Sequence, residues 1–112
     1  MNTEIVLPDT ELNPNVKFSD WTLKWLEVYK KGMVKDSSYW GTYYNPAMKH
    51  LIPYFGEMNL NDIKPMHIQE FFKIKGKKNA LETLKKMKAC LSAIFDTAID
   101  NDLCRKNQFL ET

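Results

Sequence analysis

Apolar residues recur every three or four positions in four stretches of the chain, which is the spacing that places side chains on one face of an α-helix. The first stretch predicts a helix with Ser19 as its N-cap, because a serine hydroxyl can accept from the unpaired amides of a first turn, and with its end near Gly32. Its apolar stripe is aromatic and is expected to lie in the core. The stripe consists of Phe18, Trp21, Trp25 and Tyr29.

A second helix is predicted to begin at Ser37 or Ser38, again with a hydroxyl as the cap. Pro46 lies inside this helix, and because proline lacks an N–H and crowds the preceding turn, we expect a kink or a break there. The face expected to point inward consists of Trp40, Tyr44, Ala47, Met48 and Leu51. The opposite face consists of Tyr39, Thr42, Tyr43, Lys49 and His50.

Two further helices are predicted in the second half of the chain. Pro65 suits the first position of the third, which ends near Gly76 and draws its apolar contacts from Ile68, Phe71, Phe72 and Ile74. Asn79, with Glu82 three residues later, resembles a capping box and predicts a fourth helix of about 20 residues and ~30 Å. The buried face of this fourth helix is expected to hold Leu84, Met87, Leu91, Ile94, Phe95 and Ala98.

The chain lacks the alternation of apolar and polar residues that a strand requires, so we predict an all-α fold, a compact bundle of four to five helices. Residues 1–17 carry prolines and asparagines without sustained periodicity, and we interpret them as a flexible leader or interdomain linker. Apolar runs are only a few residues long, so no membrane segment is expected, and the predicted location is the cytoplasm. Cys90 and Cys104 lack the partners that a zinc site needs, and both are expected to be buried thiols.

The positive charge of the chain is concentrated in one region. Residues 64–88 hold eight lysines and two glutamates, a net charge of +6, which leaves −4 for the remainder of a chain whose total is +2. Such asymmetry creates a local positive field that attracts polyanions, of which nucleic acid is the commonest. A lysine-rich solvated face is the alternative interpretation.

The order of motifs along the chain resembles the SAM-like core-binding domain of the phage integrase, or tyrosine recombinase, family. The resemblance rests on residues 51–56 (LIPYFG) and 60–72 (LNDIKPMHIQEFF), followed by the long last helix, and it covers residues 18–107. The family commonly has a hydroxyl residue capping the third helix and an Asn-Pro at the exit. This chain has Lys64 and Asn107-Gln108 at those positions.

In the family, this domain and a larger catalytic domain form a clamp around the crossover-site duplex, with the second and fourth helices of this domain against the major groove. The resemblance therefore implies double-stranded DNA and other recombinase protomers of a synaptic complex as partners, in a bacterial cell that carries a phage or mobile element. It implies no cofactor, no metal, no membrane and a monomeric isolated fragment. The DNA-contacting residues that it implies are Tyr39, Thr42, Tyr43, Lys49, His50, Lys77, Lys78, Asn79, Thr83, Lys85 and Lys86.

The chemistry of these side chains agrees with that assignment, because lysines neutralise phosphates, hydroxyls donate to phosphate oxygens, and asparagine can pair with adenine edges. Packing against a neighbouring helix remains an alternative for Tyr39 and Tyr43. For His50 the alternative is a solvated surface position. His67 is expected to have a structural role.

Catalysis by the family needs a tyrosine nucleophile, two arginines, a lysine and histidines around one phosphate. This chain has one arginine, Arg105, so we expect no catalytic residue here, no enzymatic activity, and residues 108–112 as the start of a linker to a separate catalytic domain. A helical protein–protein interaction module is the alternative function, since exposed aromatics also build interfaces. A helix-turn-helix regulator is disfavoured, because its turn of about 3 or 4 residues is shorter than those predicted here.

Overall fold

The computed structural model describes residues 16–104 of the chain. Predictions for residues 1–15 and 105–112, including Arg105 and the two terminal linkers, lie outside the described residues. Every named element between 16 and 104 is helical, and an isolated β-bridge joins Lys17 to Asn59. The all-α bundle is confirmed. In chain order the elements are α1 (Phe18–Trp25), η2 (Leu26–Lys30), α2 (Asp36–Ser38), η3 (Tyr39–Tyr44), η4 (Ala47–Leu51), α3 (Ile52–Phe55), η5 (Leu60–Asp62), α4 (Pro65–Gly76) and α5 (Leu81–Asp100).

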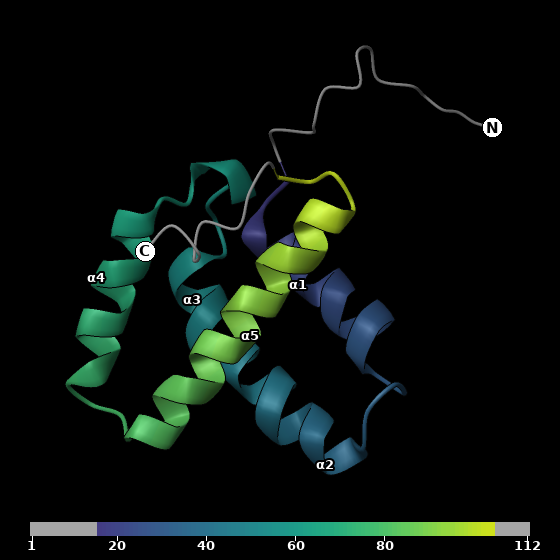
Figure 1. The fold of residues 1–112 in the computed structure, drawn as a ribbon, viewed down its shortest axis with the longest axis horizontal. Coiled ribbons are helices and arrows are strands. Elements are labelled where there is room, and N and C mark those ends of the chain that lie inside the picture. The colour runs from purple at the N-terminus through teal and green to yellow at the C-terminus, as the bar shows by residue number, and fades with distance from the viewer. Residues whose placement is uncertain (1–15, 105–112) are drawn as a thin grey trace.

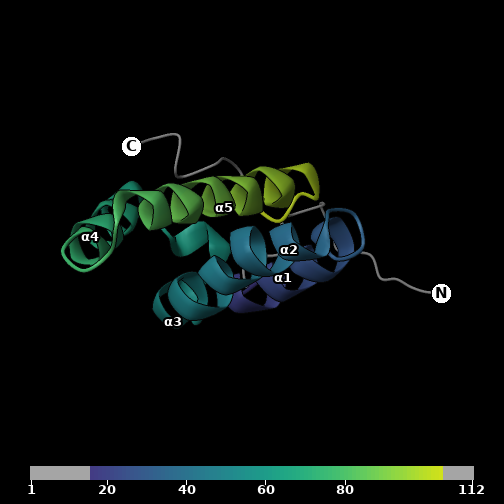
Figure 2. The ribbon, with the colours of Figure 1, turned by 90° about the horizontal axis from the view of Figure 1, so that it is seen from below.

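Four of these elements form one continuous helical segment. The chain is helical at every residue from 36 to 55, through α2, η3, η4 and α3, and we call this segment the 36–55 helix. Figure 1 shows α5 crossing the molecule, with α4 on one side of it and α1 on the other. Seen from below, α5 lies on one side of the molecule, and α1 lies with the 36–55 helix on the other (Figure 2). The crossing of α5 over the 36–55 helix positions the candidate site.

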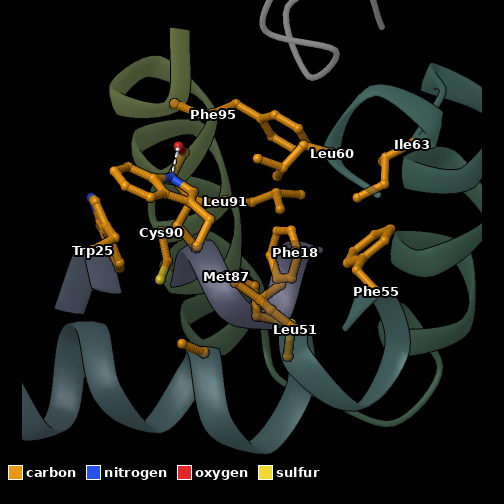
Figure 3. Close-up of a cluster of buried hydrophobic side chains, with 14 of the residues drawn as sticks. Phe18, Trp25, Leu51, Phe55, Leu60, Ile63, Met87, Cys90, Leu91 and Phe95 are labelled. Atoms are coloured by element: carbon orange, nitrogen blue, oxygen red, sulfur yellow. Dashed lines mark hydrogen bonds between the residues drawn. The ribbon is translucent and has the colours of Figure 1, made fainter. Parts of the chain in front are cut away.

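The core forms where α1, the 36–55 helix, η5 and α5 converge. Phe18, Leu51, Leu60 and Leu91 come from these four elements, and Figure 3 shows their side chains gathered in one cluster. The predicted core positions Phe18, Trp21 and Trp25 of the first helix are confirmed, whereas Tyr29 is 38% exposed. The buried indole of Trp21 donates from Nε1 to the carbonyl oxygen of Ile94 at 3.0 Å, so its one polar atom is satisfied inside the core.

The first helix begins differently from the sequence-based prediction. Lys17 is the N-cap of α1, and Ser19 lies within the helix, so the prediction of Ser19 as the cap was wrong. The reason is tertiary: the Phe18 N–H donates to the carbonyl of Met58 at 2.8 Å and the Ser19 N–H to that of Gly56 at 3.1 Å. A distant turn therefore satisfies two of the amides that a hydroxyl cap would otherwise serve.

The first helical segment ends at Lys30. Two residues later, Gly32 adopts a φ of 80°, in the left-handed region that glycine enters without steric cost. The predicted end near Gly32 is thus confirmed. The second helix begins at Asp36 with Lys35 as its N-cap, which makes the predicted caps Ser37 and Ser38 wrong, since both lie within the helix.

The 36–55 helix is wound more widely than an α-helix over most of its length. The N–H of Asn45 donates to the carbonyl of Trp40 and that of Ile52 to Ala47, five residues back in each case, which is the π-helical pattern. Because these turns hold more residues than the 3.6 of an α-helical turn, the side chains point in other directions than an α-helical spacing predicts. Tyr39 is therefore buried and Trp40 is 49% exposed, the reverse of the prediction, whereas Ala47 and Leu51 are buried as predicted.

Pro46 does not break the 36–55 helix. The chain stays helical at Asn45 and Pro46, with π turns before and after them. Proline lacks the N–H that would bond to the preceding turn, and π turns are one of the established ways in which a helix accommodates such an irregularity.

The last two helices follow the prediction closely. Pro65 opens α4 and Gly76 ends it, as predicted, and the N–H of Lys64 donates to Nδ1 of His67 at 2.8 Å, so a histidine takes the structural role at this helix start. Ile74 is an exception, since it is 49% exposed rather than packed. Helix α5 has the predicted 20 residues, and its predicted inner face is confirmed for Met87, Leu91, Ile94, Phe95 and Ala98, with Leu84 partly buried.

The capping box predicted at the start of α5 was wrong. Ala80 is the N-cap, and the side chain of Asn79 donates from Nδ2 to the carbonyl of Lys75 at 3.0 Å. Asn79 thus satisfies a carbonyl at the end of α4 instead of an amide at the start of α5.

Cys90 and Cys104 are both buried and neither forms a disulfide, as predicted. No helix between residues 16 and 104 combines the length and apolar character needed to cross a bilayer.

Candidate nucleic-acid interface

A cleft of about 190 Å³ lies where α5 crosses the 36–55 helix. We call it the crossing cleft, and it brings together four of the residues predicted to contact DNA: Lys49 and His50 from one helix, Thr83 and Lys86 from the other. Three further residues line it, namely Gly41, Asn45 and Pro46. Sequence reasoning placed polar contacts on both helices, and the structure brings two members of each set together in one cavity.

Helical spacing explains the composition of the two walls. Gly41, Asn45 and Lys49 follow one another at intervals of four, so they share one face of the 36–55 helix. Thr83 and Lys86 are three residues apart at the start of α5. Each wall therefore carries one lysine beside a small or uncharged residue, and the cleft combines positive charge with hydrogen-bonding groups.

His50 is held uncharged in this setting. Burial lowers the pKa of its imidazole below 6.5, and the positive charges of Lys75 and Lys49 lower it further. Its Nδ1 is buried and has no hydrogen-bond partner among the described residues. The positive charge of the crossing cleft at neutral pH therefore comes from lysines and not from this histidine.

Among residues 16–104, no lysine of the basic region forms an ion pair with a carboxylate. Between described residues the ion pairs are Lys17 with Glu57 at 3.0 Å and Lys31 with Glu27 at 4.0 Å, and neither involves residues 64–88. Two lysines of this region instead lie over aromatic rings, Lys75 at 5.8 Å from the centroid of Phe71 and Lys88 at 5.7 Å from that of Phe72. The lysines of this region are thus not held by ion pairs with described carboxylates, which leaves them able to interact with an external anion.

Both predicted tyrosines pack against neighbouring residues. Tyr39 is 6% exposed, with burial the main cause of its raised pKa, and its ring lies 4.9 Å from that of Trp40. The half-buried ring of Tyr43 lies edge-on to Trp25, with Nζ of Lys30 at 4.4 Å from its centroid. These contacts favour the alternative interpretation of packing for both side chains.

The remaining predicted residues lie outside the crossing cleft. Lys77 and Lys78 are exposed in the turn that joins α4 to α5, Lys85 is exposed on α5, and Thr42 is half-buried on the 36–55 helix. The amide of Asn79 is committed to the carbonyl of Lys75.

Three lining residues, Gly41, Asn45 and Pro46, were absent from the predicted DNA contacts. Asn45 lies four residues and Gly41 eight residues before the predicted contact Lys49, and this spacing was a usable signal in the sequence.

Comparison with known proteins gives a family and a solved relative. The family model described as phage integrase, N-terminal SAM-like domain, matches residues 17–75, from the start of α1 to the last turn of α4. The solution NMR structure of a fragment, residues 61–160, of a protein from Clostridium leptum is similar, with a TM-score of 0.68 and 32% sequence identity over 83% of this chain and 82% of that one. A search of curated proteins returned no match.

Proposed function

The chain belongs to the phage integrase N-terminal SAM-like domain family, and on this premise we propose that it is the DNA-binding core-binding domain of a site-specific tyrosine recombinase. The domain is proposed to span residues 18–107 and to hold the crossover-site duplex. Strand cleavage and joining are assigned to a separate catalytic domain, and other recombinase protomers are the partners in the synaptic complex.

The crossing cleft is the observation that carries this proposal. Lys49 and Lys86 lie on opposite walls of one cavity, and the lysines of residues 64–88 make no ion pair with another described residue. Duplex DNA presents two phosphate strands on either side of a groove, so cations on both walls suit the two borders of a groove. The exposed lysines of the α4–α5 turn add positive charge just before the start of α5.

The interaction-module alternative has support at a different place. Val28, Met33 and Trp40 are 55%, 72% and 49% exposed, and a partner protein could cover these large apolar side chains. Ionic strength separates the two functions, because DNA binding weakens steeply with salt through counterion release, whereas burial of apolar side chains does not.

The proposal is tested by the binding of duplex DNA to the full 112-residue chain as salt is raised. We expect non-specific affinities of about 10⁻⁴ to 10⁻⁶ M, and a double variant Lys49→Gln, Lys86→Gln should lower the log–log salt slope by up to about 1.8, or about 0.9 for each phosphate contact. Glutamine preserves helix propensity, so the melting temperature should change little.

The matched control is Lys24→Gln, Lys31→Gln on the first helical segment. Lys24 is exposed in α1, and Lys31 follows η2 and pairs with Glu27. We expect this variant to retain the parental slope. Equal loss of binding in both double variants would contradict the proposed interface, because net charge alone would then account for it.

A further inference from the structure

Asn45 holds the one side-chain amide that lines the crossing cleft. The residue is exposed, and its side chain makes no hydrogen bond with any described residue. By contrast, Asn79 and Asn101 each commit their amide to a backbone carbonyl. Asn45 therefore presents both a free donor and a free acceptor to whatever occupies the cleft.

The backbone beside Asn45 is also open. Gly41 lies one turn before it, and a Cβ placed on Gly41 would meet no atom within 4 Å, so this part of the wall is uncovered. Pro46 follows Asn45 and has no N–H to donate within the helix. The missing side chain of Gly41 thus leaves the wall of the cleft uncovered beside the free amide.

This combination differs from the chemistry that suits a phosphate. Phosphate oxygens accept hydrogen bonds only, whereas the side-chain amide of Asn45 offers an acceptor as well as a donor. The two lysines of the cleft, Lys49 and Lys86, supply the cations that a phosphate needs. A base edge that carries a donor and an acceptor side by side is the complement of Asn45, and adenine presents such an edge, N6–H₂ and N7, in the major groove.

We propose that Asn45 is a specificity-determining residue that recognises one adenine through its N6 and N7 atoms, while Lys49 and Lys86 hold the adjoining phosphates. This inference rests on the proposed function. In this arrangement the bare backbone at Gly41 lets the base edge approach the wall of the cleft. Asn45 contributes discrimination between sequences, and the lysines contribute affinity for any sequence.

The test begins with selection of preferred duplexes from a randomised pool by the full chain. Wild-type protein should select adenine at one position and bind that duplex about 5- to 150-fold more tightly than a duplex with another base pair there, the range expected for one bidentate contact. Replacing that adenine with 7-deazaadenine, which lacks the N7 acceptor, should weaken binding by wild-type protein.

Variant Asn45→Ala should lose the preference at that position and bind the 7-deazaadenine duplex as it binds the adenine duplex. Its affinity for unrelated duplexes should stay close to that of wild type. Lys49→Gln is the matched control on the same face, and it should weaken all duplexes by a similar factor and keep the preference.

A second variant probes the open backbone. Gly41→Leu places a side chain in space where no atom lies within 4 Å of the Cβ, so the fold should tolerate it, with the melting temperature as the check. Binding to the selected duplex should fall at least about tenfold, since the side chain would occupy the position of the base edge.

The outcomes are separable. If wild-type protein binds no duplex, the proposed function fails and this inference fails with it. If wild-type protein binds and selects, but Asn45→Ala keeps the preference or weakens every duplex equally, the domain is a DNA-binding module in which Asn45 recognises no base, and the inference alone is overturned.

Discussion

The two walls of the crossing cleft are built in opposite ways. Helix α5 is a regular helix of 20 residues that buries one apolar face, including Met87, Leu91 and Phe95 at 0% exposure. The 36–55 helix contains π turns, a glycine and a proline, and it exposes Trp40. Regular winding concentrates burial on one stripe, whereas irregular winding leaves backbone uncovered. At the crossing, α5 thus contributes a regular packed face, while the 36–55 helix contributes the free side-chain amide and the uncovered glycine.

The largest expected effect comes from the buried face of α5. Phe95→Ala should lower the free energy of unfolding by about 3 to 5 kcal/mol, because the side chain is fully buried and its loss combines a transfer term with a cavity. Urea or thermal unfolding measures it. Leu81→Ala, at a residue of the same helix that is 65% exposed, should change stability by no more than about 0.5 kcal/mol. Similar losses in both variants would show that α5 is not stabilised by one face.

Pro46→Ala tests whether the proline in the 36–55 helix lowers the free energy of unfolding. Alanine is favoured over proline in a helix interior by about 3 kcal/mol, whereas removing roughly two buried methylene groups costs about 1.6 kcal/mol. We therefore expect a net gain of about 1 kcal/mol in the free energy of unfolding, measured in urea. A loss of stability would mean that the buried ring of Pro46 contributes more through packing than it costs in helix geometry.

Gly41→Ala sharpens the same comparison at a smaller scale. Because an added Cβ meets nothing within 4 Å and alanine is the better helix former, the free energy of unfolding should rise by about 0.5 to 1 kcal/mol. Gly56→Ala is the contrasting variant, since a Cβ there would clash with the backbone carbonyl of Ile52, and its stability should fall. Gains at both positions would contradict the distinction between an open glycine and a packed one.

The smallest expected effect is the pH dependence that His50 contributes. Its pKa in the folded chain lies below 6.5, so in the unfolded chain His50 takes up a proton at a higher pH than in the folded one. Stability should therefore fall as pH drops through 6.5 toward the lowered value. In His50→Gln this part of the pH dependence should be missing when unfolding is followed between pH 5 and 8. Parallel pH profiles for the two proteins would rule out the assigned burial of this side chain.

The sequence allowed good prediction wherever one periodic face decided the structure. The limits and inner face of α5 follow from its 3.6-residue periodicity, and α4 follows from Pro65 and Gly76. The helix caps could not be predicted, because the first amides of α1 are satisfied by Met58 and Gly56, which are distant in sequence.

Only part of the candidate site was predicted from the sequence, because one of its walls is an irregular helix. Its lysines are visible in the charge distribution, but the burial of Tyr39 depends on the π turns of the 36–55 helix. No simple spacing rule reports such turns. The error was therefore one of rotation about a helix axis, and it exchanged Tyr39 for Trp40 on the inner face.

Cys90 joins the two walls, since its Sγ lies 3.6 Å from the carbonyl oxygen of Tyr43 and burial raises the pKa of the thiol to about 12. Only a thiolate attacks alkylating and disulfide reagents at useful rates, so the thiol of Cys90 is unreactive while the helices remain in contact. Each reaction at Cys90 therefore reports an opening that exposes this sulfur, either by separation of α5 from the 36–55 helix or by unfolding of the whole domain. The rate at which Cys90 is modified measures how often such openings occur. A duplex that contacts both walls should lower that rate.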